Sequence, residues 1–284
     1  IMLGISLFPP IFILVCIMAL PESPRWLVLA RKNEKALLVL KQTLPPEADP
    51  SAVLDKIILN TQEDSEASWE EMLHLPDWPS KRVVLLTIAL GFWQQATGSE
   101  AVVYYTPVVL RDAGMGSSSM LLLGTTLVGI AKLLGEVVCA YLVEGVGRRR
   151  LLNLSSVLVT VSLVAISITF ALSKNAYANI FLLCNYMWWF SIGLGPVTWV
   201  CMSELLPTRL KAKSMSLGVF ANRLTSGICA LSFLSLQEAA GLSGAYGLYA
   251  CISVIALGFY FKAVPETRGK TLEEIQDALA AGHL

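Results

Sequence analysis

Four ionisable residues stand inside apolar stretches of the sequence: Glu100, Lys132, Glu136 and Arg223. A charged side chain in a membrane-spanning helix is costly where it faces lipid, so each is expected to face a partner or an aqueous cavity. Such charges, together with nearby amides and hydroxyls, suit the binding of a hydroxyl-rich solute. A network that joins helices is the alternative, and it is favoured for Glu136, one helical turn from Lys132. The accompanying polar groups are Gln94, Gln95, Thr97, Ser191, Thr198 and Asn222.

A second chemical signal is an interrupted apolar stretch before Glu204, broken by Gly193, Gly195 and Pro196. Interrupted helices at membrane depth occur where the freed backbone groups face protein or a water-filled cavity. Trp199 follows the interruption by one turn, where its ring is placed to lie against a small ring or a chain of hydroxyls. The alternative is a kinked packing helix with an interfacial anchor.

The composition is that of a membrane protein. Of the 284 residues, 55% are hydrophobic and 15% are charged, whereas soluble domains average about 45–50% and about 25%. The formal net charge is zero, which gives no argument for a nucleic-acid partner. The six cysteines lie in apolar runs without paired spacing and the two histidines lie in polar segments, so the sequence predicts neither a metal site nor another cofactor.

Hydrophobic stretches set the expected organisation of the chain. Residues 1–20 form an apolar span whose abrupt start indicates a fragment, and residues 21–82 are charged and punctuated by proline. Short helices are expected there over 25–40, over 51–61 and from the capping-box pair Ser68 and Glu71 onwards, either bracing the membrane domain or forming a solvated linker. Six further spans follow at 83–105, 120–143, 151–172, 178–203, 214–236 and 246–264, each long enough to cross an apolar core of roughly 30 Å.

Basic residues gather in the short loops on one side of these spans. The opposite loops contain Arg111 and Lys174 alone. The positive-inside rule therefore places the basic loops, and with them the 21–82 segment, in the cytoplasm. The basic set is Arg148, Arg149, Arg150, Arg209, Lys211, Lys213, Arg268 and Lys270.

Six motifs run from one end of the chain to the other. They are PESPRWLV at 21–28, QQATGSEAVVYYTP at 94–107, GVGRRR at 145–150, GPVTWVCMSELLPTRLKA at 195–212, NRLTSG at 222–227 and PETRGKTLEEI at 265–275. With these motifs the chain resembles the sugar porter family of the major facilitator superfamily. Within that family it is most similar to the polyol and monosaccharide proton symporters of plants.

The resemblance implies an all-α membrane protein with the major facilitator fold, in which cytoplasmic helices join two six-helix halves. On that template the chain is a fragment with about seven transmembrane helices. Residues 1–20 are the last transmembrane helix of the N-terminal half, 21–82 the cytoplasmic helical linker, 83–264 the C-terminal six-helix domain and 265–284 a cytoplasmic tail. The five helices missing on this reading normally supply half of the substrate cavity and the acid that exchanges the coupling proton.

The resemblance also implies a substrate site in which Gln94 and Gln95 bond sugar hydroxyls and Trp199 packs against the substrate. Glu100 and Lys132 stand where glucose facilitators have asparagine, as in the polyol group. These two residues are expected to cradle a flexible polyhydroxylated chain, or to pair with each other when the site is empty. Ser191 and Arg223 replace a glutamate and a tryptophan of the glucose facilitators. The predicted substrate-binding residues are Gln94, Gln95, Glu100, Lys132, Ser191, Trp199, Asn222 and Arg223.

A second implied site is a cytoplasmic charge network that latches the two halves together while the outside is open. The alternative is positive-inside anchoring alone. Gly145 stands where the family usually has a basic residue, so a weaker latch is expected at that corner. The residues that match, or lie nearby in the implied fold, are Glu22, Arg25, Glu144, Arg148, Arg149, Glu204, Arg209, Glu266 and Arg268.

The implied function is secondary transport of a monosaccharide or polyol by alternating access. Proton-coupled symport is favoured, a facilitative uniporter is the alternative, and a transporter-like sugar sensor is a more distant one. No constellation of catalytic residues indicates an enzyme. The expected partners are a sugar or polyol, a proton, membrane lipid and the missing N-terminal half, and the expected location is the plasma membrane. Glucose, xylose, inositol, sorbitol and mannitol all stay open as substrates.

Overall fold

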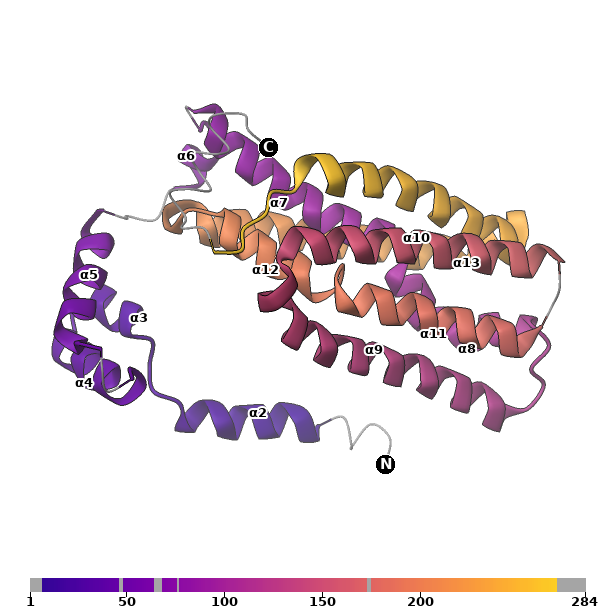
Figure 1. Ribbon diagram of the computed structural model, residues 1–284, viewed down its shortest axis with the longest axis horizontal. Helices are drawn as coiled ribbons and strands as arrows, with labels where there is room; N and C mark the ends of the chain where they lie inside the picture. The colour runs from indigo at the N-terminus through magenta and orange to yellow at the C-terminus, as the bar shows by residue number, and fades with distance from the viewer. Residues whose placement is uncertain (1–6, 46–47, 64–67, 76, 173–174, 270–284) are drawn as a thin grey trace. The chain divides into compact units, whose positions relative to one another are not determined.

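Figure 1 shows the computed structural model, which describes residues 7–45, 48–63, 68–75, 77–172 and 175–269. Within these ranges the regular secondary structure is entirely helical. The chain divides into two compact units, Ile1–Glu66 and Ala67–Leu284. Each unit is described by itself.

The described residues of the first unit form four helices. The apolar helix α2 (Phe8–Ala19) covers most of the predicted span 1–20 and exposes its large side chains, whereas α3 (Pro24–Leu29), α4 (Asn33–Thr43) and α5 (Pro50–Glu63) bury Leu27, Ala36, Leu40 and Leu54 together. The single helix predicted over 25–40 is wrong, because α3 and α4 are separate. Arg31 has a φ of 58° between them, and a residue in this left-handed region ends a helix.

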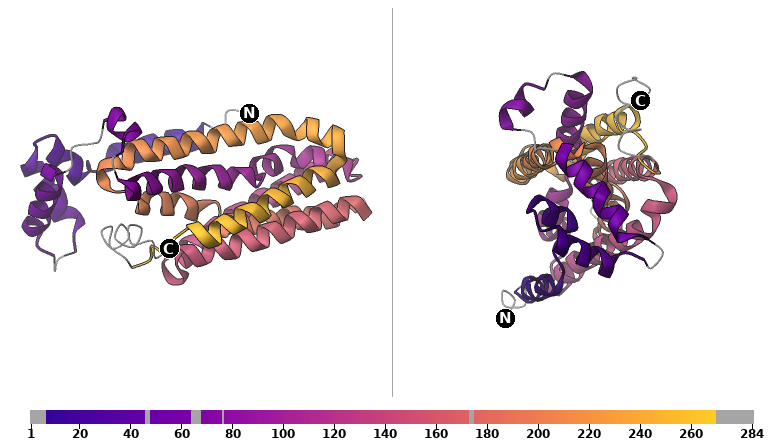
Figure 2. Two further views of the ribbon diagram at one scale, coloured as in Figure 1. Left: turned by 90° about the horizontal axis from the view of Figure 1, so that it is seen from above. Right: turned by 90° about the vertical axis from the view of Figure 1, so that its left-hand side faces the viewer.

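The second unit is a bundle that positions both candidate sites. In Figures 1 and 2, α10 lies beside the C-terminal part of α13. In Figure 1, α9 lies beside α11. Among the described residues, four helical stretches are long and apolar enough to cross a membrane: Ser118–Val146, Arg148–Leu172, Ala176–Leu205 and Arg209–Ala263. The helices of the unit are α6 (Trp69–Leu73), α7 (Trp78–Ala96), α8 (Ser99–Asp112), α9 (Ser118–Val146), α10 (Arg148–Leu172), α11 (Ala176–Ile192), α12 (Pro196–Leu205) and α13 (Thr208–Ala263).

One predicted span differs from the helices observed, and three others agree with them. The predicted interruption of 178–203 is confirmed, since α11 ends at Ile192 and α12 begins at Pro196. The span predicted at 83–105 is two helices, because Gly98 adopts a φ of 83° between α7 and α8. The spans predicted at 214–236 and 246–264 lie in the two helices that make up α13, which the non-helical backbone of Gly241, with a φ of 70°, separates.

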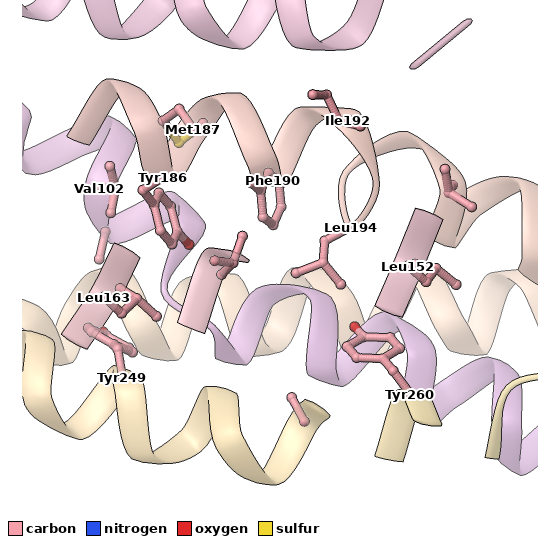
Figure 3. Packing of buried hydrophobic residues seen from close by; sticks show 14 of the residues in the cluster. Val102, Leu152, Leu163, Tyr186, Met187, Phe190, Ile192, Leu194, Tyr249 and Tyr260 are labelled. Atoms are coloured by element: carbon pink, nitrogen blue, oxygen red, sulfur yellow. The ribbon is translucent and has the colours of Figure 1, made fainter. Parts of the chain in front are cut away.

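Two aromatic side chains surround the break between α7 and α8. The hydroxyl of Tyr186, on α11, donates to the carbonyl of Thr97 at 3.1 Å. The ring of Tyr249, on α13, lies so close to Gly98 that a Cβ there would stand 2.9 Å from it. Figure 3 shows both rings in the core among side chains from α8, α10 and α11. The break therefore requires glycine, and it sets where the first turn of α8 begins.

Helix α6 has the predicted capping box. The backbone N–H of Glu71 donates to the Ser68 hydroxyl, and the N–H of Ser68 donates to the Glu71 carboxylate, each at 3.1 Å. Met72 on this helix packs with Val84 of α7 and Leu210 of α13. The short helix is thus attached to α7 and α13 of its own unit.

Candidate functional site: a polar cavity and a charge network around Arg148

A cavity of about 210 Å³ opens between the broken helices and their neighbours. Six of the eight predicted substrate-binding residues line it, together with Glu136. Each of the helices α7, α8, α9, α12 and α13 contributes at least one of them, so the cavity depends on how these helices pack together. The six are Gln94, Gln95, Glu100, Lys132, Trp199 and Arg223.

Gln94 satisfies the backbone groups that the interruption of α11 sets free. Its Nε2 donates to the carbonyls of Leu194 at 2.9 Å and Gly195 at 2.6 Å. The N–H of Leu194 donates to the Ser155 hydroxyl at 3.0 Å. The freed groups therefore face protein, as buried backbone groups must.

Asn222 connects Gln94 to Arg223, although it does not line the cavity itself. It is fully buried, and its Nδ2 donates to Oε1 of Gln94 at 2.6 Å and to the Gly91 carbonyl at 3.0 Å. Its Oδ1 accepts from Nε and Nη2 of Arg223 at 3.1 and 2.7 Å. Nε2 of Gln95 lies 3.4 Å from the same oxygen. These residues form one continuous polar network at the cavity wall.

The charges in the cavity pair differently from the prediction. Nη1 of Arg223 lies 3.8 Å from Oε1 of Glu100. The expected pairing of Glu100 with Lys132 is absent, and the ion pair between Lys132 and Glu136 is absent too; all these side chains belong to the described part of the chain. The break at Gly98 places Glu100 in the first turn of α8, within reach of α13.

Ser191 does not line the cavity. It is 1% exposed, its hydroxyl has no hydrogen-bond partner, and its Cβ packs against the backbone of Gly135. Sequence reasoning missed Ser99, which lines the cavity and donates to Oε1 of Gln95 at 2.9 Å. It also missed Phe190. The position of Ser99 beside Gly98 in the QQATGSE motif was the available signal.

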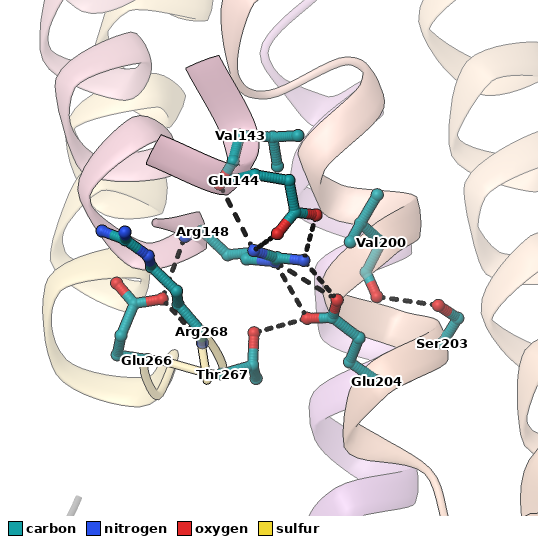
Figure 4. A network of polar contacts seen from close by, with 9 residues as sticks. All are labelled: Val143, Glu144, Arg148, Val200, Ser203, Glu204, Glu266, Thr267 and Arg268. Atoms are coloured by element: carbon teal, nitrogen blue, oxygen red, sulfur yellow. Dashed lines mark hydrogen bonds and ion pairs between the residues drawn. The ribbon is translucent and has the colours of Figure 1, made fainter. Parts of the chain in front are cut away.

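Arg148 is the centre of the charge network drawn in Figure 4. Its guanidinium lies 2.8 Å from the carboxylates of Glu144 and Glu204, and its side chain is only 9% exposed. These contacts join the C-terminal end of α9, the first turn of α10 and α12. The two carboxylates accept charge-assisted hydrogen bonds from the buried guanidinium and so compensate for its desolvation.

The segment after α13 closes this network. The hydroxyl of Thr267 donates to Glu204 at 2.6 Å, and the backbone N–H of Arg148 donates to Glu266 at 2.9 Å. Gly147 has a φ of 97°, and a Cβ there would stand 2.8 Å from the Glu266 carboxylate. The Arg268 guanidinium donates to the carbonyl of Gly145, the position where the family usually has a basic side chain.

Other predicted members of the network lie elsewhere. Arg149 donates to the carbonyl of Phe261 at 2.8 Å. Arg209 pairs with Glu71 at 2.9 Å, on α6. Glu22 is exposed in the first unit, and the side chain of Arg25 lies outside the described residues. The structure thus joins five of the nine predicted residues: Glu144, Arg148, Glu204, Glu266 and Arg268.

Membrane-length helices that break beside a polar cavity are the general pattern of secondary transporters. Residues 1–279 match the family model described as Sugar (and other) transporter, and the chain belongs to this family. It is 35% identical to probable polyol transporter 4 of Arabidopsis thaliana over 284 residues. It is 30% identical to the facilitated trehalose transporter Tret1 of Aedes aegypti over 275 residues.

These relatives are longer than the chain. The alignments cover 97% and 94% of the chain but only 54% of the Arabidopsis protein and 34% of the Aedes protein. The fold is that of the major facilitator superfamily. The proton:xylose symporter XylE, bound to 6-bromo-6-deoxy-D-glucose, matches with a TM-score of 0.81 and 25% identity over 96% of this chain and 57% of XylE. A partially occluded inward-open XylE from E. coli matches with a TM-score of 0.73 and 25% identity, over 93% of this chain and 54% of XylE.

Proposed function

We propose that the chain forms the C-terminal half of a secondary transporter that moves a polyol or monosaccharide across a membrane by alternating access. The observation that carries the proposal is the cavity, in which amides, charged groups and Trp199 converge where α7 meets α8 and α11 meets α12. Substrate sites at discontinuous helices are the general pattern of secondary transporters. Residues 1–20 and 21–82 are then the last helix of the other half and a cytoplasmic linker.

The charged groups of the cavity favour a flexible polyhydroxylated solute. Glu100 accepts hydrogen bonds, Lys132 donates them, and Arg223 donates from a planar fork of N–H groups. Hydroxyls of an acyclic chain can turn to meet all three. The relatives that are named as polyol transporters support the same substrate class.

Proton coupling is the favoured mechanism, since XylE, which shares the fold at 25% identity, is a proton:xylose symporter. Facilitated transport is the second candidate, because the Aedes relative is named a facilitated transporter. In either case the Arg148 network, whose joined residues all belong to the second unit, would hold together the ends of α9, α10 and α12 against which the other half latches. The transporter would reside in the plasma membrane and act without chemical conversion of its solute.

The test joins this chain to the preceding helices of the Arabidopsis relative and expresses the product in cells that lack their own hexose and polyol uptake. Sorbitol, inositol, xylose and glucose are added in turn while uptake and external pH are recorded. The chain alone and a Trp199→Ala variant serve as controls. Uptake of a polyol with alkalinisation of the medium, abolished by a protonophore, is the expected result.

Two other outcomes would change the proposal. Uptake without a change in pH would replace symport by facilitated transport. A fusion that reaches the membrane, as judged by fluorescence of an attached marker, yet takes up none of the four solutes would overturn the proposed function.

A further inference from the structure

Glu136 is a carboxylate in the cavity that has no hydrogen-bond or ion-pair partner among the described residues. It lines the cavity from α9, where it is exposed. The other carboxylate of the cavity, Glu100, lies 3.8 Å from the guanidinium of Arg223. Protonation of Glu100 would therefore give up an ion pair, whereas protonation of Glu136 gives up none.

The packing of α9 against α11 turns Glu136 toward the cavity. A Cβ at Gly135 would stand 2.7 Å from Cβ of Ser191 and 2.9 Å from the carbonyl oxygen of Trp188, so the two helices touch at this turn. This contact fixes the rotation of α9 about its axis. Glu136 lies about 100° further around the helix, and Lys132 precedes it by one turn on the same face. Both side chains line the cavity.

The ionisable groups that face this cavity come from α8, α9 and α13. The tyrosines and cysteines of α8, α11 and α12 lie outside its lining. On two other helices that pack against α9, Arg148 and Glu204 pair with each other at 2.8 Å, also outside the lining. Cys139, one turn after Glu136 on α9 itself, is buried in the core. The ionisable groups in the lining are Glu100, Lys132, Glu136 and Arg223.

The charge of Glu136 acts on Lys132. An ionised carboxylate one helical turn away attracts the ammonium group and draws it along α9. Protonation of Glu136 removes this attraction and leaves Lys132 free to donate hydrogen bonds to the hydroxyl oxygens of a solute. Binding of a proton at Glu136 and binding of a solute at Lys132 therefore favour each other, and thermodynamic linkage makes this coupling reciprocal.

We propose that Glu136 is a proton-binding site of the cavity and couples the proton to the solute through Lys132. The proton passes from water in the cavity to a carboxylate oxygen of Glu136, and it returns to water when the solute leaves. The same helix continues for about 12 Å from Glu136 to Glu144, which pairs with Arg148 at 2.8 Å. The inference rests on the proposed proton-coupled transport and names a residue of this half that carries the coupling.

The experiment measures solute binding to the purified fusion of this chain with the preceding helices of the Arabidopsis relative. Sorbitol, inositol, xylose and glucose are titrated at intervals from about pH 4 to about pH 8. The solute that binds best is expected to bind the parent roughly three- to tenfold more tightly at the acidic end, the worth of one hydrogen bond to a charged group. Its addition to the parent in weak buffer is expected to remove protons from the solution.

Glu136→Gln is the decisive variant. Its neutral amide imitates the protonated carboxyl, so its affinity is expected to be independent of pH and close to that of the parent at acidic pH. Addition of the solute should then remove no protons from the solution. A merely structural role of Glu136 would instead leave the pH dependence in place and lower affinity or stability at every pH.

Two further variants make the test specific to Glu136. Glu100→Gln removes the carboxylate that pairs with Arg223, so affinity is expected to fall while the dependence on pH stays. Lys132→Gln removes the group through which the proton acts, and its affinity is expected to be weak at every pH. Parental pH dependence in Glu136→Gln would overturn the proposal. If Glu136→Gln does not fold, as judged by its unfolding temperature, pH dependence that persists in Lys132→Gln overturns it instead.

The outcomes also separate this inference from the proposed function. If the folded parent binds none of the four solutes, the proposed function is wrong and the inference falls with it. If the parent binds a solute with the same affinity at every pH and without proton uptake, the role of Glu136 is overturned, while transport of that solute stands as facilitated transport.

Discussion

The carboxylate of Glu100 lies 3.8 Å from the guanidinium of Arg223, which bridges the first turn of α8 to α13 across the cavity. The same guanidinium holds Asn222, so one side chain connects a broken helix to the buried amide network. Lys132, by contrast, projects into the same cavity without an ion-pair partner among the described residues. The two cations of the cavity therefore have different roles, and this difference can be measured.

A double-mutant cycle is expected to find coupling between Glu100 and Arg223. Arg223 is 57% exposed, so solvent screening limits the coupling free energy to about 0.2–1 kcal/mol. The cycle compares Glu100→Gln, Arg223→Gln and the double variant by the free energy of substrate binding. A parallel cycle with Lys132→Gln should be additive within about 0.3 kcal/mol. Greater coupling of Glu100 to Lys132 than to Arg223 would contradict the observed pairing.

Replacing Arg148 by alanine is expected to destabilise the second unit by about 2–3 kcal/mol, because it leaves Glu204 without its main partner in a partly buried position. Thermal unfolding in detergent provides the measurement. Arg149→Ala, which removes a guanidinium with a single backbone contact, is the matched control and should cost less. Equal losses in the two variants would show that the network adds nothing to stability.

Of the two helix breaks beside the cavity, at Gly98 and at residues 193–196, the second could be predicted from the sequence. Gly193, Gly195 and Pro196 together remove helix propensity within four residues, which is a local signal. Gly98 is a lone glycine in an apolar stretch, and such a glycine is tolerated in many helices. At this break the ring of Tyr249, which comes from a distant segment of α13, leaves no room for a Cβ. Long-range packing of this kind leaves no local pattern to read.

In the candidate site, too, some features could be predicted from the sequence and others are set by packing. Residue types identified the cavity, since Gln94, Gln95 and Trp199 line it as expected. The exceptions depend on geometry. Ser191 is directed toward Gly135 by the rotation of α11, and Glu100 reaches Arg223 because α8 starts a new helix at Ser99. Helix rotation and the exact start of a helix are set by packing, and spacing in the sequence does not specify them.

Gly147→Ala is expected to destabilise the protein by about 1–3 kcal/mol, for two reasons. Its φ of 97° is unfavourable for a residue with a Cβ, and that Cβ would stand 2.8 Å from the Glu266 carboxylate. Gly145→Ala is the control, because no atom lies within 4 Å of a Cβ built there and the position is helical. Thermal unfolding of both variants tests the tight turn. An unfolding temperature of Gly147→Ala equal to that of the parent would contradict the prediction.

The docking of α6 is expected to weaken at acidic pH through Glu71. The Ser68 backbone N–H and then the Arg209 guanidinium hold the pKa of Glu71 below its ordinary value of 4.5. Because the folded pKa is the lower one, the contribution of Glu71 to stability is complete above about 4.5 and is lost as the pH falls through the folded pKa. Hydrogen exchange of the α6 amides, corrected for the intrinsic pH dependence, should therefore accelerate below that value.

Two variants serve as controls for the role of the carboxylate. The α6 amides of Glu71→Gln should exchange quickly at both neutral and acidic pH. Those of Glu70→Gln, which leaves the capping box intact, should behave like the parent. An α6 that stays protected at low pH in the parent would show that its apolar contact through Met72, and not the carboxylate, holds it to α7 and α13.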